Sequence, residues 1–265
     1  MNLENIKPVK PIAPYLGGKS KLSKTICSII DNTEHKTYAE PFVGMGGIIF
    51  RKQKIARAEV INDYNYEVFT LFRVLQRHYD EFLRQLEYVN HSRNHFNHIK
   101  NLEPKHLTDI ERAARFYFLL RSSFGAMTKS YGVDKRNPDR FNMDKYKKDL
   151  AYTVNRLRRV AMENLDFEVF INKYDSVDTL FYLDPPYYGC ENDYGKELFK
   201  RDDFIRLKKA LDSIQGKFIL SLNDVPPVRD IFKGYNFKEV ELLYTVSKAG
   251  STKAKEVIIS NYNFD

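Results

Sequence analysis

Hydrophobic and polar positions follow helical and strand-like rhythms in turn over the first part of the chain. The first apolar stripe recurs at helical spacing, with Leu22, Ile26, Ile29 and Ile30 on one face. Short apolar runs bounded by glycine or polar residues follow it and predict buried strands. The predicted elements are a helix over 19–30, a strand over 37–42, a helix over 48–54, a strand over 58–62 and a helix from Tyr64 onward.

The same alternation returns in the last third of the chain. The predicted elements there are a strand over 179–183, a helix over 201–214, a strand over 217–222, and two strands over 237–246 and 256–262 that pair antiparallel. Alternating helices and strands are typical of a parallel sheet covered by helices. The sequence therefore predicts an α/β fold with a Rossmann-like sheet.

The middle of the chain is polar, basic and helical. Thr108 with Glu111 three residues later forms a capping box that opens a helix running to Arg121. Residues 122–142 read as a loop, and a second apolar stripe follows at Leu150, Val154, Leu157 and Val160. We expect residues 79–160 to form an inserted, mainly helical lobe, and residues 1–78 and 161–265 to form the sheet domain.

Positive charge is concentrated in this lobe. The chain has a net charge of +8, and residues 115–159 hold 12 Lys and Arg against four acidic residues. The rest of the chain is therefore close to neutral. Such an excess suits a phosphate backbone, although a solvated helix face explains the charge alone equally well.

Several classes of protein and site are excluded. No run approaches the roughly 18–20 apolar residues of a membrane helix, and the N-terminal segment lacks the apolar core of a signal peptide, so we expect a cytoplasmic protein. Cys27 and Cys190 are too few for a disulfide framework or a four-cysteine zinc site. His91, His95 and His98 have helical spacing, but we interpret them as surface or DNA-facing residues and expect no metal.

Two features at strand ends indicate a nucleotide-like ligand. Gly44 and Gly46 lie in a turn after the strand over 37–42, where glycine allows tight turning and close approach to a ligand. Asp63 ends the next strand, where a carboxylate can accept hydrogen bonds from ribose hydroxyls. A tight turn and a helix cap before Tyr64 are the alternative explanations.

The sharpest signal is Asp184-Pro185-Pro186-Tyr187, directly after the strand over 179–183. The lone pair of an exocyclic base amine is delocalised into the ring, which makes the amine a poor nucleophile. The Asp184 carboxylate and the Pro185 carbonyl could accept its two N–H bonds and return that lone pair to nitrogen. Tyr187 could stack on an extruded base, and transfer from a sulfonium methyl requires no metal.

Nearly all of the chain resembles the Dam-type DNA adenine-N6 methyltransferases. Four motifs carry the resemblance in the family's order: residues 15–19, 40–46, 61–65 and 184–187, with a weaker match over 164–167. The resemblance implies methyl transfer from S-adenosylmethionine to adenine N6 of a base flipped from double-stranded DNA. The catalytic residues would be Asp184, Pro185, Pro186 and Tyr187. The cofactor-binding residues would be Tyr15, Gly18, Lys19, Phe42, Gly44, Gly46, Asp63, Asp166, Phe167 and Asp184.

The family also implies a DNA-reading lobe between the motifs at 61–65 and 184–187, where the charge excess lies. The candidate DNA contacts are Arg121, Phe124, Lys129, Tyr131, Lys135, Arg136 and Arg140. Well-known members carry an Arg-Tyr-Gly-Tyr-Asn-Gly-like run, whereas this chain has Arg121-Ser122-Ser123-Phe124-Gly125-Ala126. The target sequence, with GATC among the options, therefore stays open, as does a cognate restriction endonuclease as partner.

Other functions compete with this interpretation. Gly17-Gly18-Lys19-Ser20 suggests a P-loop, but Ala13 stands where its first glycine is needed. Aspartate in the catalytic motif favours adenine, while a cytosine-N4 or RNA amine methyltransferase remains an alternative. A catalytically inactive DNA-binding relative is a third option, and the intact glycine turn and acidic residues argue against it.

Overall fold

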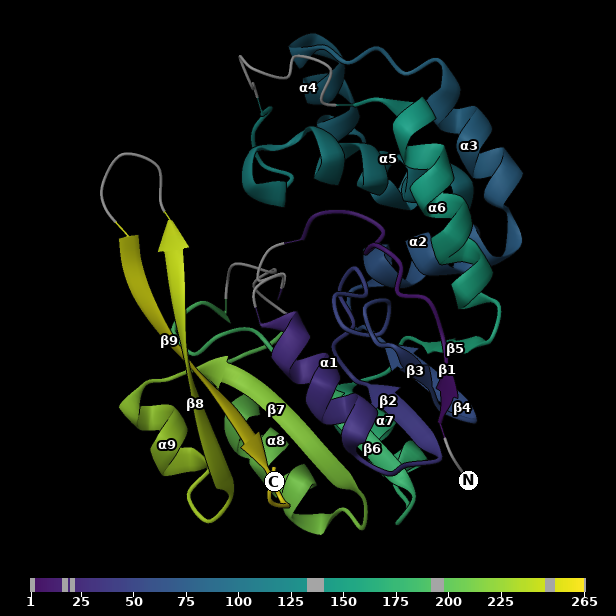
Figure 1. Ribbon diagram of the computed structural model, residues 1–265. Coiled ribbons are helices and arrows are strands. Elements are labelled where there is room, and N and C mark those ends of the chain that lie inside the picture. The colour runs from purple at the N-terminus through teal and green to yellow at the C-terminus, as the bar shows by residue number, and fades with distance from the viewer. Residues whose placement is uncertain are drawn as a thin grey trace.

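A seven-stranded mixed sheet forms the centre of the protein (Figure 1). The computed structural model describes residues 3–15, 19, 22–132, 141–191, 198–245 and 251–264, without the side chains of 126, 241–245 and 251–254. The strand order is β5-β4-β2-β6-β7-β9-β8. The strands are β2 (Thr37–Glu40), β4 (Ala58–Asn62), β5 (Val160–Glu163), β6 (Thr179–Leu183), β7 (Lys217–Asn223), β8 (Asn236–Thr245) and β9 (Ser251–Ser260).

The sheet is parallel from β5 to β7 and antiparallel beyond. Strand β2 pairs in parallel with both β4 and β6, while β9 runs antiparallel between β7 and β8. The hairpin β8–β9 extends past the sheet toward the helical lobe (Figure 1). The predicted α/β sheet and its closing antiparallel pair are confirmed.

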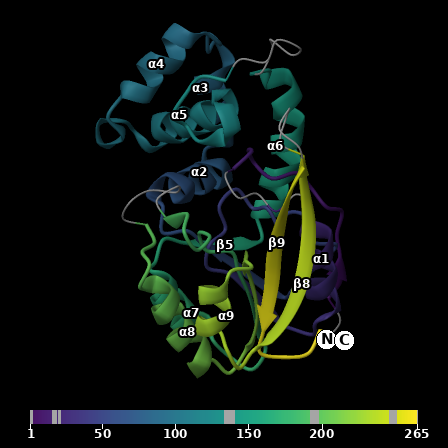
Figure 2. The same ribbon diagram turned by 90° about the vertical axis from the view of Figure 1, so that its left-hand side faces the viewer.

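Helices cover both faces of the sheet, as Figures 1 and 2 show together. One face carries α1 (Ser23–Asn32), and the other carries α7 (Phe167–Tyr174), α8 (Asp203–Ser213) and α9 (Pro226–Ile231). The side chains of β6 divide between the two cores by the two-residue period of a strand. Leu180 and Tyr182 join the core on the α1 face, whereas Phe181 and Leu183 join the core under α7 and α8. Both faces are therefore buried, as expected for parallel strands.

A helical lobe lies beyond the edge at which the parallel strands end (Figure 1). It contains α3 (Tyr79–Glu87), α4 (Arg93–Asn101), α5 (Asp109–Ser122) and α6 (Met143–Leu157), and α2 (Tyr66–Arg77) packs against α5 and α3. The Thr108–Glu111 capping box at the start of α5 is confirmed. The core of the lobe is continuous with the core on the α1 face. The exact domain boundaries stay a prediction.

Two predicted helical features are wrong. Residues 44–51 form successive turns in place of a helix, and Lys54–Ile55 (β3) then pairs antiparallel with Glu4–Asn5 (β1). A helix is avoided here because Gly46 has φ +75° and the Phe50 ring packs back against it. Val160, expected on the last helical stripe, belongs to strand β5, because α6 ends at Leu157.

The structure also bears on membrane helices, disulfides and metal sites. Within the described ranges, no helix is long and apolar enough to cross a membrane. The described residues contain no disulfide and no group of three His, Cys, Asp or Glu side chains placed to hold a metal. His91 precedes α4, so it does not share a helix with His95 and His98, whose rings lie 6.4 Å apart.

Candidate active site

The site lies where the strand order changes direction. The chain passes from β2 outward through β4 to β5, then returns to β6 beside β2 and continues to β7. Ligands of open α/β sheets bind at such a crossover, beyond the carboxyl ends of the strands. A cavity of about 550 Å³ lies here, with Pro41 after β2, Asp63 after β4 and Asp184 after β6 in its wall.

Two positions of the turn after β2, 44 and 46, have no room for a Cβ atom. Gly44 has φ +50°, and a Cβ placed there would lie 2.9 Å from Cδ1 of Tyr15. Gly46 has φ +75°, and a side chain there would collide with the Phe50 ring. Left-handed backbone of this kind favours glycine. The turn therefore brings Tyr15 and the Gly44 backbone close together at the cavity wall.

Asp63 links this turn to the start of α2. Its Oδ2 accepts from the Gly44 N–H at 2.9 Å, and its Oδ1 accepts from the Asn65 N–H at 2.9 Å. The cap of α2 is Asn65, whose side chain accepts from Glu67 N–H, so Asp63 is not the helix cap. Burial raises the pKa of Asp63 to about 6, and the two N–H groups oppose that rise.

Lys19 binds the carboxylate that follows β6. Its side chain is 3% exposed, and its Nζ lies 2.8 Å from Asp184 Oδ1 and 3.9 Å from Glu256 Oε2. The same ammonium donates to the Tyr187 hydroxyl at 2.6 Å. Burial raises the pKa of Asp184, and the Lys19 charge opposes that rise. A buried lysine therefore favours the ionised, hydrogen-bond-accepting form of Asp184.

Two hydroxyl groups support Asp184 from within the sheet. Ser221 on β7 donates to Asp184 Oδ1 at 3.2 Å, and its Oγ lies 3.0 Å from the Tyr182 hydroxyl. Ser221 is fully buried and Tyr182 nearly so. Since Oδ1 receives both Lys19 and Ser221, the carboxylate is held by donors on that one oxygen.

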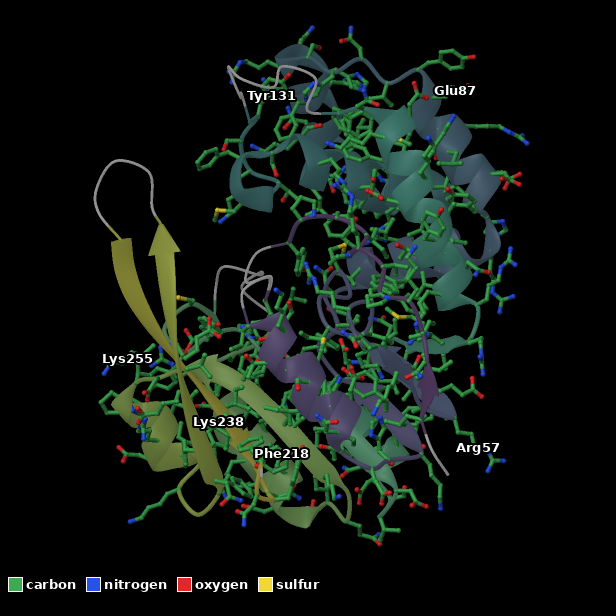
Figure 3. The ribbon with its side chains drawn as sticks, viewed as in Figure 1. Arg57, Glu87, Tyr131, Phe218, Lys238 and Lys255 are labelled. Carbon is green, nitrogen blue, oxygen red and sulfur yellow. The ribbon has the colours of Figure 1, made fainter. Side chains whose placement is uncertain are left out.

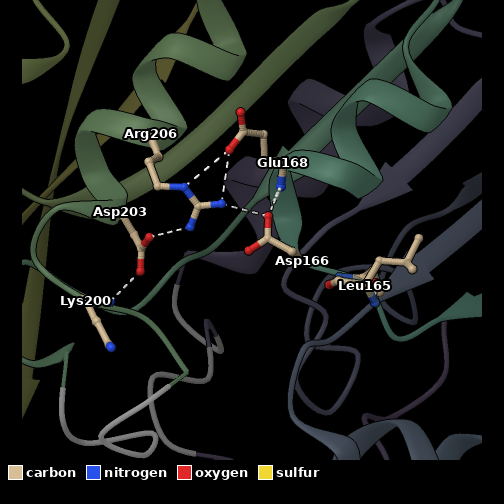
Figure 4. A network of polar contacts seen from close by, with 7 residues as sticks. Leu165, Asp166, Glu168, Lys200, Asp203 and Arg206 are labelled. Carbon is tan, nitrogen blue, oxygen red and sulfur yellow. Dashed lines mark hydrogen bonds and ion pairs between the residues drawn. The ribbon is translucent and has the colours of Figure 1, made fainter.

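A third carboxylate and a group of aromatic rings line another part of the cavity. Asp166 caps α7 by accepting from Glu168 N–H, and Arg206 of α8 lies 2.9 Å from Asp166 Oδ1 (Figure 4). Phe167 packs against Phe42 and Phe199, with ring centroids 5.6 and 5.8 Å apart. This side of the cavity can hold a flat apolar ring beside a hydrogen-bond acceptor.

Glu40 is buried below the same cavity. It accepts from the Tyr38 hydroxyl at 2.5 Å, and Lys52, which pairs with Glu59, lies close enough to influence it. Burial raises the pKa of Glu40 to about 8, with Tyr38 and Lys52 acting against the rise. Glu40 is therefore mostly protonated at neutral pH and adds little negative charge beside Asp184.

Most of the predicted catalytic and cofactor-binding residues come together. Those in the cavity wall are Tyr15, Lys19, Phe42, Gly44, Asp63, Asp166, Phe167, Asp184 and Pro186. Gly46 and Pro185 are buried beside it, and Tyr187 is reached through its contact with Lys19. Gly18 lies outside the described residues. Their roles stay predictions, although these residues from five sequence segments gather at one cavity.

The predicted DNA contacts that the structure describes have different surroundings, and their roles stay predictions. Arg121 donates to Ile12 O at 2.6 Å and lies 4.2 Å from the Tyr146 ring centroid, so it joins the lobe to the N-terminal segment. Tyr131 packs against Phe96 at the far end of the lobe (Figure 3). Phe124 is 69% exposed, and Lys129 is exposed. Lys135, Arg136 and Arg140 lie outside the described residues.

Four residues that shape the site were not predicted from the sequence. Ser221 and Glu256 lie beside Asp184 and Lys19, while Arg206 and Phe199 lie beside Asp166 and Phe167. None belongs to a recognisable motif. For Ser221, the signal was a polar residue within the mostly apolar β7, whereas Glu256 follows the polar first half of β9 and Arg206 had no signal.

The chain is similar to known DNA methyltransferases over nearly its whole length. The model of the family described as "D12 class N6 adenine-specific DNA methyltransferase" matches residues 15–246. A type II methyltransferase of Lactococcus lactis subsp. cremoris is 26% identical, over 99% of this chain and 99% of its own. A type II methyltransferase of Methanocaldococcus jannaschii is 25% identical, over 96% and 99%. A DNA adenine methylase of Haemophilus influenzae is 23% identical, over 96% of each chain.

Proposed function

The chain belongs to the D12 class N6 adenine-specific DNA methyltransferase family, and from this premise we propose how its cavity residues divide the work of methyl transfer. The reaction transfers a methyl group from S-adenosylmethionine to N6 of an adenine in DNA. Membership of this family favours adenine N6 over cytosine N4 and RNA, and the intact glycine turn and acidic residues argue against an inactive relative. The observation that carries the assignment of roles is the Lys19–Asp184 pair at the crossover between β2 and β6.

The chemistry of the cavity fits S-adenosylmethionine. The Asp63 oxygens each accept one backbone N–H and retain capacity for ribose hydroxyls. Asp166 and the rings of Phe42 and Phe167 suit an adenine base, and a cavity of about 550 Å³ is within the usual size of small-molecule sites. When bound, S-adenosylmethionine supplies an electrophilic methyl group that already carries its leaving group.

We assign the activation of the adenine amine to Asp184 and the Pro185 carbonyl. Both are hydrogen-bond acceptors, and two acceptors aimed at the amine return its lone pair to nitrogen. Lys19 keeps Asp184 ionised, while Ser221 fixes the orientation of its carboxylate. We assign stacking on the flipped base to Tyr187, whose hydroxyl is tied to Lys19. Pro186 would stiffen the loop between them.

The lobe is the proposed DNA-reading region, because its charge excess lies beyond the carboxyl edge of the sheet. Lys129→Glu should weaken duplex binding severalfold at low salt, since each phosphate contact contributes a salt-dependent share of affinity. Lys36→Glu is the matched control, because Lys36 precedes β2 at the opposite edge of the sheet. Equal affinity of both variants across a salt series, measured by fluorescence anisotropy, would refute this placement.

Two broader assignments concern the cellular setting of the protein. We propose that the protein acts in the cytoplasm together with the DNA that it modifies. A cognate restriction endonuclease is a proposed partner, supported by the type II methyltransferases among the relatives.

The deciding experiment is transfer from labelled S-adenosylmethionine to unmethylated plasmid DNA, followed by mass spectrometry of the nucleosides. N6-methyladenine is the expected product, and mapping its positions identifies the target sequence. Label in N4-methylcytosine or in RNA alone would contradict the proposed function.

A further inference from the structure

Arg206 lies beside the part of the cavity assigned above to the base of the methyl donor. It belongs to α8, forty residues after Asp166 in the chain, and its guanidinium contacts three carboxylates (Figure 4). Nη1 donates to Asp203 Oδ1 at 2.6 Å, and Nη2 donates to Asp166 Oδ1 at 2.9 Å and to Glu168 Oε2 at 3.0 Å. These contacts, Asp203 foremost, raise the pKa of Arg206 above its usual range, so it is permanently charged.

The two oxygens of the Asp166 carboxylate differ in their hydrogen bonds. Its Oδ1 accepts from Arg206 and from Glu168 N–H, both at 2.9 Å. Its Oδ2 has no hydrogen-bond partner in the part of the chain that the structure describes (Figure 4). The two donors therefore fix the rotation of the carboxylate and leave one acceptor oxygen at the cavity. A fixed acceptor distinguishes a ligand that donates a hydrogen bond from one that does not.

Arg206 also contacts the neighbouring ring. Its guanidinium carbon lies 4.7 Å from the centroid of Phe167, which is 5% exposed and lines the same cavity. A guanidinium at this distance makes a cation–π contact with the ring, and a lysine replacement lacks the planar group. One side chain thus holds both the acceptor and the apolar wall in place.

We propose that Arg206 is a positioning residue that sets the preference of the cavity for a 6-aminopurine base. It acts through Asp166, whose free oxygen accepts from the exocyclic amine, and through Phe167, which supports the ring. This role rests on the proposed function, because it presupposes that Asp166 faces the base of the methyl donor. A purine carrying a carbonyl in place of the amine offers no such donor and is disfavoured.

Calorimetry with two probes tests this role without catalysis. S-adenosylhomocysteine carries the amine, and S-inosylhomocysteine carries a carbonyl at the same position. In Arg206→Ala, affinity for the amine probe should fall roughly five- to tenfold, the scale of one ordinary hydrogen bond, because Asp166 remains but its orientation is no longer fixed. Affinity for the carbonyl probe should change much less, so the discrimination between the two probes shrinks. Arg206→Lys retains the charge without the planar fork and should lie between wild type and Arg206→Ala.

Lys208→Ala is the matched control, because Lys208 lies on the same helix and pairs with Asp212 away from the cavity. Equal weakening of both probes in Arg206→Ala would show a merely structural effect and would overturn the proposal. Unchanged binding in Arg206→Ala, together with weakened amine binding in Asp166→Ala, would overturn the role of Arg206 alone. Unchanged amine binding in Asp166→Ala would overturn the proposed role of Asp166 and with it this inference.

Discussion

The two ends of the cavity hold their carboxylates in opposite ways. Asp63 is held by two backbone N–H groups, and no cation is paired with it among the described residues. Asp184 is held by the buried ammonium of Lys19 and by the Ser221 hydroxyl. Burial raises the pKa of both. Neutral donors leave the Asp63 charge uncompensated, whereas the cation compensates that of Asp184.

This difference suits two kinds of task. A group that binds neutral hydroxyls benefits from an uncompensated charge, because its hydrogen bonds are then strong. A group that must polarise an amine during the reaction has to be ionised at working pH, and a buried cation secures that state. The two ends should therefore respond differently to mutation and to pH.

The largest effect is expected from Asp184→Ala. Loss of a fixed acceptor should lower kcat by about a thousandfold or more, the scale of a lost electrostatic stabiliser at a reacting centre. Single-turnover methyl transfer measures this loss. Near-normal turnover in a variant that melts like the wild type would show that Asp184 has no part in the reaction. The proposed difference in task between Asp63 and Asp184 would then be wrong.

Lys19→Met should have the next largest effect on turnover. Removing the buried cation raises the pKa of Asp184 further, so turnover at neutral pH should fall roughly tenfold or more and should recover as the pH rises. The pH dependence of kcat measures the shift of the acid limb. Lys24→Met, an exposed position on α1, is the control. An acid limb that does not move would show that Lys19 does not govern the ionisation of Asp184.

Asp63→Asn tests the carboxylate whose charge has no paired cation among the described residues. Affinity for S-adenosylhomocysteine should fall by roughly tenfold, since the ionised acceptor is replaced by a neutral amide. In the wild type, the affinity should weaken as the pH falls through about 6, where Asp63 takes up a proton. Calorimetry between pH 5 and 8 follows both effects. The same pH dependence in the variant would assign it to another group.

Glu40→Gln should have the smallest effect. The pKa of Glu40 is raised from 4.5 to about 8, so its contribution to stability is full below 4.5 and is lost as the pH rises through about 8. The variant mimics the protonated form, so relative to wild type it should gain about 1 kcal/mol of stability between pH 7 and pH 9. Thermal melting at both pH values checks this. Parallel melting curves would show that Glu40 does not titrate in this range.

Parts of this fold could be predicted because the local pattern decides them. The predicted strands over 58–62 and 179–183 coincide with β4 and β6. All five residues of β6 are buried, as its nearly continuous apolar run predicts for a parallel sheet covered on both faces. The Thr108–Glu111 signature marks the start of α5 correctly, because a cap depends only on neighbouring residues. Asp184 was identifiable because it directly follows such a strand.

Other features could not be predicted, because they depend on contacts between distant parts of the chain. Residues 48–54 are apolar enough for a helix, yet contact between Gly46 and the Phe50 ring, together with the β1–β3 pair, keeps them in turns. Arg206 and Ser221 influence the site through elements far away in the sequence, so no local spacing reveals them. The contact of Arg121 with Ile12 O was equally hidden, because only the folded chain brings that carbonyl near, and its contact with DNA stays a prediction.

The position of β9 has a consequence for synthesis of the protein on the ribosome. Lys19 is made early, Asp184 much later, and Glu256, the acidic residue behind Lys19, only with the last strand. Strand β9 must also enter the sheet between β7 and β8, although β8 is made first. The sheet around Asp184 is therefore completed only when β9 has emerged, and a product that ends before β9 would lack both Glu256 and the strand between β7 and β8.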